Sequence, residues 1–150
     1  MITLREINAD SVRTICALRV APGQEVLVAP NAISIAQAYF EPAAWFRAIH
    51  ADDLPVGFAM LYDPTRAVAP VASDTCYLWR FMIAAPFQRM GHGAAALAQL
   101  IDHARTLPNV KKFQLSYAPV DGSPREFYVR LGFHETGEVD DGEIVMGLQL

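Results

Sequence analysis

The segment Gln88-Arg89-Met90-Gly91-His92-Gly93 separates a predicted buried strand, Thr75 to Ile83, from a predicted alanine-rich helix, Ala94 to Arg105. The first N–H groups of a helix have no partner within the helix, and the helix dipole adds partial positive charge there, so phosphate is favoured. Glycines at positions 91 and 93 permit a close backbone approach and positive φ angles. Arg89 adds a side-chain charge. The junction therefore predicts an anion site.

Two common nucleotide-binding motifs do not fit this junction. A nucleoside-triphosphate loop needs Gly-Lys-Ser/Thr at its end, which is absent here. A dinucleotide fingerprint needs a third glycine and an acidic residue about twenty positions later. A tight turn that merely joins a strand to a helix is an alternative for any Gly-x-Gly pair.

On both sides of the junction the chain alternates strands and helices in the order β-α-α-β-β-β-α-β-α-β-β. We expect Asn8 or Asp10, Asn31 and Ser123 to cap three of the helices. This order predicts an α+β (mixed α/β) fold, with residues 1–150 forming a single domain around one sheet. The other expected strands are Ile2–Ile7, Trp45–Ala51, Val56–Tyr62, Lys112–Tyr117, Phe133–Val139 and Glu143–Gln149, the other helices are Val12–Leu18, Asn31–Tyr39 and Pro124–Leu131, and Asp63–Asp74 is a loop.

Composition restricts the class of protein. The 150 residues carry 12 basic and 16 acidic side chains, a formal net charge of −4, and no basic stripe, which argues against nucleic acid as a partner. No apolar stretch suits a membrane span, and the first residues lack the pattern of a signal peptide, so we expect a cytoplasmic protein. Cys16 and Cys76 lie sixty positions apart and form no metal or redox motif.

The junction resembles the coenzyme A pyrophosphate site of the GNAT superfamily of N-acetyltransferases, whose motif is Gln/Arg-x-x-Gly-x-Gly/Ala. A second signature of that family resembles Asp121-Gly-Ser-Pro-Arg-Glu-Phe-Tyr128-Val-Arg-Leu-Gly132-Phe133. Val28-Ala-Pro-Asn31 and Arg80-Phe-Met-Ile83 look like the bacterial spermine/spermidine (diamine) acetyltransferases. The resemblance covers nearly the whole chain. It implies the GNAT fold, a mostly antiparallel twisted sheet of about seven strands flanked by about four helices, and a homodimer.

The resemblance also implies that acetyl-CoA is a co-substrate and that no metal is needed. Asp121 stands where the family usually has Asn, and an ionised carboxylate donates no hydrogen bond, so Ser123 is a candidate to replace that contact. The implied coenzyme-binding residues are Phe81, Met82, Ile83, Gln88, Arg89, Met90, Gly91, His92, Gly93, Ala94, Asp121, Ser123 and Tyr128.

Tyr128 is the implied general acid, because the family places a tyrosine hydroxyl near the coenzyme sulfur and a phenol stays protonated at neutral pH. An aromatic anchor for a short helix would explain Tyr128 equally well on spacing alone. In the family, the backbone of Phe81, Met82 and Ile83 binds pantetheine and the thioester carbonyl. The candidates for the general base are a water chain or one of the carboxylates Glu41, Asp52, Asp53 and Glu143.

The acceptor is expected to be a primary amine of a small molecule, with polyamines such as spermidine or spermine as the leading class. Its candidate binding residues are Tyr39, Glu41, Trp45 and Glu143, although core packing explains the aromatic residues as well. An amino acid, an aminoglycoside-like drug or a protein N-terminus are alternative acceptors. A non-catalytic acyl-CoA sensor is a further alternative, which only Asp121 favours.

Overall fold

The computed structural model describes residues 1–69 and 72–150, and these form a seven-stranded sheet in the order β1-β2-β3-β4-β5-β7-β6. All neighbouring strands are antiparallel except β4 and β5. The predicted fold class and element order are therefore confirmed. The elements are β1 (Ile2–Arg5), α1 (Val12–Ala17), α2 (Asn31–Phe40), β2 (Ala44–Ala51), β3 (Leu54–Tyr62), β4 (Thr75–Ile83), α3 (His92–Thr106), β5 (Lys112–Tyr117), α4 (Arg125–Arg130), β6 (His134–Asp140) and β7 (Glu143–Gln149).

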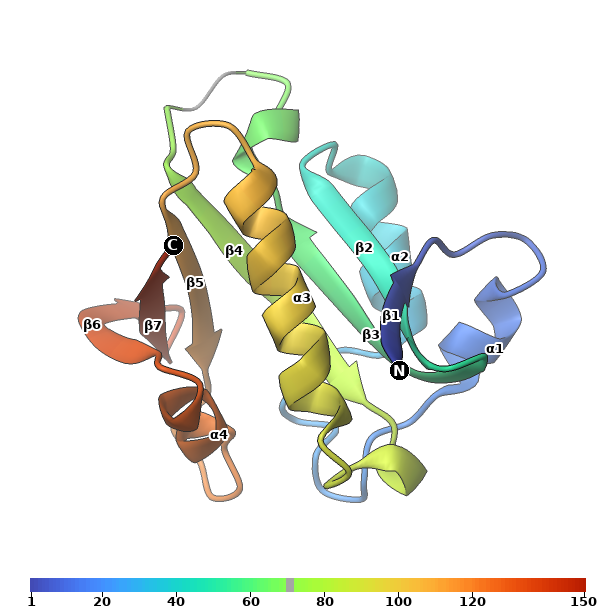
Figure 1. The fold of residues 1–150 in the computed structure, drawn as a ribbon. Coiled ribbons are helices and arrows are strands. Elements are labelled where there is room, and N and C mark those ends of the chain that lie inside the picture. Colours follow the sequence, from blue (N-terminus) through green and yellow to red (C-terminus); the bar gives the residue numbers. More distant parts are fainter. Residues whose placement is uncertain (70–71) are drawn as a thin grey trace.

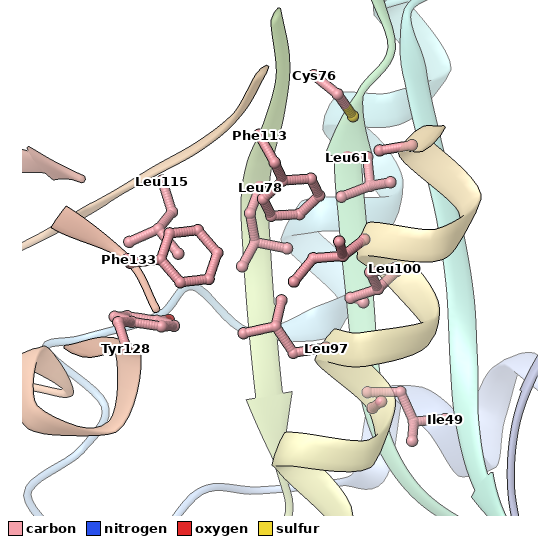
Figure 2. Packing of buried hydrophobic residues seen from close by; sticks show 14 of the residues in the cluster. Ile49, Leu61, Cys76, Leu78, Leu97, Leu100, Phe113, Leu115, Tyr128 and Phe133 are labelled. Carbon is pink, nitrogen blue, oxygen red and sulfur yellow. The ribbon is translucent and has the colours of Figure 1, made fainter. Parts of the chain in front are cut away.

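The sheet carries a hydrophobic layer on each face. Helix α3 covers one face, where Leu97 and Leu100 pack against Leu78 and Phe113 (Figure 2). Helices α1 and α2 lie on the other face, over a smaller cluster around Phe58, and α2 is seen behind β2 in Figure 1. The central strands are buried on both sides, which explains why Thr75 to Ile83 reads as an almost continuous apolar run.

Strands β4 and β5 pair only at their beginnings. The parallel register runs from Thr75 and Lys112 to Tyr77 and Gln114, and then the two strands diverge (Figure 1). Strand β4 continues to Ile83 with β3 as its partner on one side only. The backbone N–H and C=O groups on its other edge are therefore free of strand partners over this length, and groups of that kind need a hydrogen-bonding partner.

Strand β4 also contains a β-bulge. Leu61 of β3 pairs with Leu78, but the preceding residue, Met60, pairs with Arg80, so Trp79 is an extra residue in β4. Because side chains alternate along a strand, this extra residue moves Arg80 to the opposite face from Leu78. Phe81, one position further on, returns to the face that α3 covers.

Two predicted helix caps are wrong, and the third is only partly right. The N-cap of α2 is Pro30, and that of α4 is Pro124 rather than Ser123. Ser11 caps α1, while the Asn8 side chain accepts hydrogen bonds from the backbone N–H groups of Asp10 and Ser11 just before it. Side chains of this type bind nearby backbone in several local patterns, which spacing alone does not separate.

Asn31 has a tertiary role instead of a capping role. It is the first residue of α2, is 2% exposed, and donates from Nδ2 to the carbonyl oxygen of Ile15 at 2.9 Å. This bond joins the start of α2 to the end of α1. The relative position of the two helices on this face therefore depends in part on one buried amide.

The remaining differences from the predicted boundaries are small. Helix α3 begins at His92, two residues earlier than expected, and β1 ends at Arg5. In the predicted loop from Asp63 to Asp74, residues Pro64–Arg66 form a 3₁₀ turn, and Pro70 and Val71 lie outside the described residues. Within residues 1–69 and 72–150, no helix has the length and apolar character to cross a bilayer. No cluster of three or more metal-ligating side chains occurs in the same ranges.

Substitution of Asn31 distinguishes a helix-capping role from the observed hydrogen bond to Ile15. An N-cap acts through an acceptor oxygen, so Asn31→Asp would be tolerated at a cap, whereas the observed contact requires a donor. We expect Asn31→Ala to lower the free energy of unfolding by about 1–2 kcal/mol and Asn31→Asp to lower it further, since a buried carboxylate would face a carbonyl oxygen. Urea denaturation measures both values. Equal stability of the native protein and Asn31→Asp would contradict the assignment.

Candidate functional site

A cavity of about 940 Å³ opens where β4 and β5 diverge. Its walls are the second half of β4, the end of β5, helix α4, the strand-to-helix junction and the loop from Val20 to Ala29. Cavities for small-molecule ligands typically measure about 300–1,000 Å³. The free backbone edge of β4 therefore lies in a space large enough for an extended organic ligand.

The predicted anion site forms one end of this cavity. Gly91 is the N-cap of the 15-residue helix α3 and has a φ of +83°, a conformation that favours glycine. Arg89 is exposed with a φ of +62° and also lines the cavity. The first N–H groups of α3, its dipole and the Arg89 charge are thus brought together at this end of the cavity.

Gly93 differs from Gly91 in its backbone conformation and in its surroundings. The prediction of a positive φ is wrong at this position, because Gly93 lies inside α3 with ordinary helical geometry. A Cβ atom there would lie 3.4 Å from Cζ of Phe127 and 3.7 Å from Cγ1 of Ile83. These are ordinary van der Waals distances, so the packing of α3 against α4 and the end of β4 does not itself require a glycine here.

Gln88 connects two walls of the cavity. Its Nε2 atom donates to the carbonyl oxygen of Ile83 at 2.8 Å and to Oε1 of Gln24 at 2.7 Å. Ile83 is the last residue of β4, and Gln24 belongs to the loop from Val20 to Ala29. The Gln88 side chain therefore holds the junction, the strand and the loop in one arrangement.

Tyr128 lies deep in the wall formed by α4. It is 7% exposed and packs edge-to-face on Phe127 and Phe133, with ring centroids 5.4 and 5.9 Å away (Figure 2). Burial, and secondarily the negative charge of Glu143, raise the pKa of Tyr128 well above the ordinary tyrosine value. The hydroxyl therefore stays protonated at neutral pH and can donate a hydrogen bond.

Glu143 lies at the start of β7 and lines the same cavity. Ser116 Oγ donates to Glu143 Oε1 at 2.7 Å. Ser116 occupies the face of β5 opposite to the buried Leu115 and Tyr117, so Glu143 and Ser116 belong to the side of the sheet that α2 covers. Nearby in β4, burial raises the pKa of Tyr77, whose hydroxyl is buried without a hydrogen-bond partner.

The structure brings ten of the predicted site residues to this cavity. These are Phe81, Met82, Ile83, Gln88, Arg89, Gly91, Gly93, Ala94, Tyr128 and Glu143. The other predicted coenzyme-binding residues are not part of the lining but lie close in sequence to residues that are. Met90 and His92 belong to the junction, and Asp121 and Ser123 to the loop before α4.

The remaining acceptor candidates lie elsewhere. Tyr39 is 85% exposed at the end of α2. Glu41 accepts a hydrogen bond from the backbone N–H of Ala43 at 3.1 Å. The Trp45 ring is stacked on His103 at 4.1 Å, and the guanidinium carbon of Arg47 is 4.2 Å from its centroid. These three side chains do not line the cavity.

Two of the carboxylates considered as general bases form ion pairs and do not line the cavity. Asp52 pairs with the N-terminal amine at 2.7 Å, and Asp53 pairs with Arg5 at 3.1 Å, both at the turn between β2 and β3. Of Glu41, Asp52, Asp53 and Glu143, only Glu143 lines the cavity.

Sequence reasoning missed several lining residues, among them Gln24, Glu25, Arg80, Ser116 and Phe127. One of them had a signal in the sequence, because Arg80 is the only charged residue of β4. A charge within an otherwise apolar central strand needs a partner or a function. The residues of the loop from Val20 to Ala29 carried no comparable signal.

Comparisons with known proteins agree with this architecture. A family model described as the acetyltransferase (GNAT) family matches residues 6–133. No curated protein sequence matches the chain.

Solved structures with a similar fold include three with coenzyme A or acetyl-CoA. PaiA N-acetyltransferase from Thermoplasma acidophilum, in complex with coenzyme A, has a TM-score of 0.69 at 14% identity, covering 100% of this chain and 99% of its own. Aminoglycoside acetyltransferase AAC(6')-Ib, in complex with coenzyme A, has a TM-score of 0.78 at 16% identity, covering 99% and 95%. A GNAT family acetyltransferase from Elizabethkingia anophelis with acetyl-CoA bound has a TM-score of 0.68 at 17% identity, covering 99% and 98%.

Proposed function

The chain belongs to the acetyltransferase (GNAT) family, and on this premise we propose that it transfers the acetyl group of acetyl-CoA to a primary amine of a small molecule. One observation carries the proposal: the unpaired edge of β4 and the glycine-capped start of α3 line one cavity. The coenzyme is a long molecule with a pyrophosphate at one part and an amide-rich arm at another. An anion site followed by free backbone groups suits these two parts in turn.

The placement of acetyl-CoA follows from these two features. The pyrophosphate binds the N–H groups at the start of α3 and Arg89, with Met90, His92 and Ala94 around it. The pantetheine arm runs along the backbone of Phe81, Met82 and Ile83, and Asp121 and Ser123 border it from the loop before α4. The thioester then lies near Tyr128. Neighbouring folds hold coenzyme A or acetyl-CoA, which supports this placement.

The reaction is a direct attack of the neutral amine on the thioester carbonyl. The nitrogen lone pair forms the C–N bond, and backbone N–H groups of β4 stabilise the oxyanion, a contribution typically worth about 3–4 kcal/mol. The C–S bond then breaks, the leaving thiolate takes a proton from the Tyr128 hydroxyl, and the proton that the nitrogen loses after the attack restores that hydroxyl. Holding amine and thioester in contact supplies up to about 7–11 kcal/mol of the barrier reduction.

Glu143 is the proposed base. An alkylamine is mostly protonated at neutral pH, because its pKa is close to that of lysine, about 10. A proton must therefore leave the nitrogen before or during the attack. Among the carboxylates considered, Glu143 alone lines the cavity, and its negative charge acts on Tyr128. Ser116 donates to one of its oxygens and fixes its orientation.

Polyamines such as spermidine and spermine, which the resemblance in sequence implied, are one acceptor class to test. Glu25 and Glu143 on the cavity wall are the negative charges that suit a cationic acceptor. A homodimer, a cytoplasmic location and a single-domain organisation stay predictions from the sequence.

An acetyl-transfer assay tests the proposed function. Thiol release from acetyl-CoA is measured with spermidine, kanamycin and a set of amino acids as acceptors, alongside calorimetric titration of coenzyme A. We expect thiol release that depends on at least one amine. Coenzyme binding without transfer to any acceptor would contradict the enzyme proposal and favour an acyl-CoA sensor.

Replacement of the proposed acid separates chemistry from binding. Tyr128→Phe keeps the ring packing on Phe127 and Phe133 but removes the proton donor. We expect kcat to fall by about 10²–10⁴-fold, the usual contribution of a positioned acid or base. The KM for acetyl-CoA should change by less than about threefold. Tyr62→Phe, outside the cavity, is the matched control. A loss of kcat below twofold would show that Tyr128 is not the acid.

The base proposal predicts a pH signature. Glu143→Gln removes the proton acceptor while keeping the shape of the side chain, so kcat/KM at pH 7 should fall by about 10²–10⁴-fold. The deficit should shrink as the pH approaches 10, since free amine then needs no base. Glu138→Gln, on the exposed strand β6, provides the control. A deficit that is constant from pH 7 to pH 10 would exclude a base role for Glu143.

A further inference from the structure

Arg80 is the only charged residue of β4, and it lines the cavity. The bulge at Trp79 directs Arg80 toward α2, and its Nη2 donates to Oε1 of Gln37 at 3.1 Å. Its Nη1 donates to the carbonyl oxygen of Trp79 at 3.0 Å, and the guanidinium carbon lies 5.6 Å from the centroid of the Trp79 ring. The guanidinium is therefore fixed in position.

Arg80 forms no ion pair with the described part of the chain. None of the ion pairs formed within residues 1–69 and 72–150 includes Arg80, and its Nε is buried without an acceptor. Burial lowers the pKa of Arg80, and the charge of Glu143 acts in the opposite direction. A guanidinium nevertheless stays charged. A half-buried, unneutralised cation in a ligand cavity is a binding site for an anion.

The two hydrogen bonds use only part of the donor capacity of the guanidinium. Each Nη nitrogen carries two hydrogens, and the contacts with Trp79 and Gln37 use one on each. One hydrogen on each Nη therefore remains for a ligand. Two donors on one planar group match the two oxygens of a carboxylate.

Glu143 supplies the opposite charge in the same cavity. Strands β4 and β7 are separated by β5, so their backbones lie at least two strand spacings apart, roughly 10 Å. Neither Arg80 nor Glu143 forms an ion pair with any side chain of the described residues, including each other. Arg80 and Glu143 are thus unpaired charges of opposite sign on strands that flank β5, in a cavity wall that also carries Glu25, Arg89 and Arg130.

We propose that the acceptor is a zwitterion, an amine that also carries a carboxylate, in which Arg80 binds the carboxylate while Glu143 and Tyr128 face the amine. This inference rests on the proposed acetyl transfer and names its substrate class as amino acids or similar amino-carboxylates. A polyamine carries ammonium groups along its length, and one of them would face Arg80. Arg80 therefore selects against the purely cationic acceptors that the sequence resemblance favoured.

The test compares each acceptor with its own carboxamide, which has the same shape without the negative charge. The pairs are L-alanine and L-alaninamide, L-lysine and L-lysinamide, and 4-aminobutanoate and 4-aminobutanamide, with spermidine for reference. We expect at least one carboxylate to exceed its amide, and spermidine, by about tenfold or more in kcat/KM. Equal kcat/KM values for every carboxylate and its amide would overturn the proposal. A higher kcat/KM for spermidine than for all three carboxylates would overturn it as well.

Variants of Arg80 connect this preference to the residue. Arg80→Met should lower kcat/KM for the preferred carboxylate by about 10–100-fold, as expected for a charge-assisted pair, and change its amide by less than about threefold. Arg80→Lys should give a kcat/KM for the carboxylate between those of the native protein and Arg80→Met. Gln37→Met, which removes only the positioning bond, should raise KM for the carboxylate alone. Arg13→Gln, an exposed charge on α1, is the control. Equal losses for acid and amide would refute the role of Arg80.

A second readout separates this inference from the proposed reaction. If no amine is acetylated, the proposed function fails, and binding to the complex with coenzyme A still tests Arg80. Calorimetry should then show one of the three amino-carboxylates binding the native protein at least about tenfold more tightly than Arg80→Met. No difference in binding would overturn the inference. Circular dichroism of each variant verifies that it is folded.

Discussion

The early end of the pairing between β4 and β5 is the constraint on which the functional architecture depends. Only three residue pairs join the strands before they separate, and the free edge of β4 then needs hydrogen-bonding partners that the fold does not supply. Strand β4 keeps its position because β3 pairs with it on the other side and because Gln88 holds its last carbonyl. Phe127 of α4 packs on Phe81 with ring centroids 6.5 Å apart. The opening is thus maintained by contacts around it rather than across it.

The two faces of β4 contact different substrates in the proposed reaction. Phe81 and Ile83 face the side of the sheet that α3 covers, where the anion site and α4 meet. Arg80 faces α2, and Ser116 of β5 lies on that same side together with its partner Glu143. In the proposed complex the coenzyme therefore approaches from one side of the sheet and the acceptor from the other. The reacting atoms meet at the opening between the strands, beside Tyr128.

Strong local patterns in the sequence predicted most of the fold and one end of the site. The long apolar strand, the alanine-rich helix and the glycine junction each follow from neighbouring residues, and each was found where expected. Contacts between distant residues were not predictable in this way. Asn31 is of a residue type common at helix N-caps, but its side-chain amide donates a hydrogen bond to a carbonyl sixteen positions away. Trp45 reads as an acceptor-site aromatic, yet it lies in the hydrophobic cluster on the face that α3 covers, with its ring stacked on His103.

Arg80 shows the limit of periodicity most clearly. Strict alternation from Cys76 and Leu78 would place Arg80 on the buried face beneath α3, where an unpaired charge is not tolerated. The bulge reverses the alternation, and nothing in the sequence around Trp79 marks its position. A one-residue irregularity thus decides whether this side chain belongs to the core or to the cavity.

The two hydrogen bonds of Gln88 connect the junction and the loop from Val20 to Ala29 through one side chain. In the proposed complex, a ligand that orders the junction would also restrain the loop, which lines the same cavity. Linkage is reciprocal, so each substrate would raise the affinity for the other by the same factor. A single glutamine amide could in this way make the binding of two chemically unrelated molecules cooperative without any movement of the sheet.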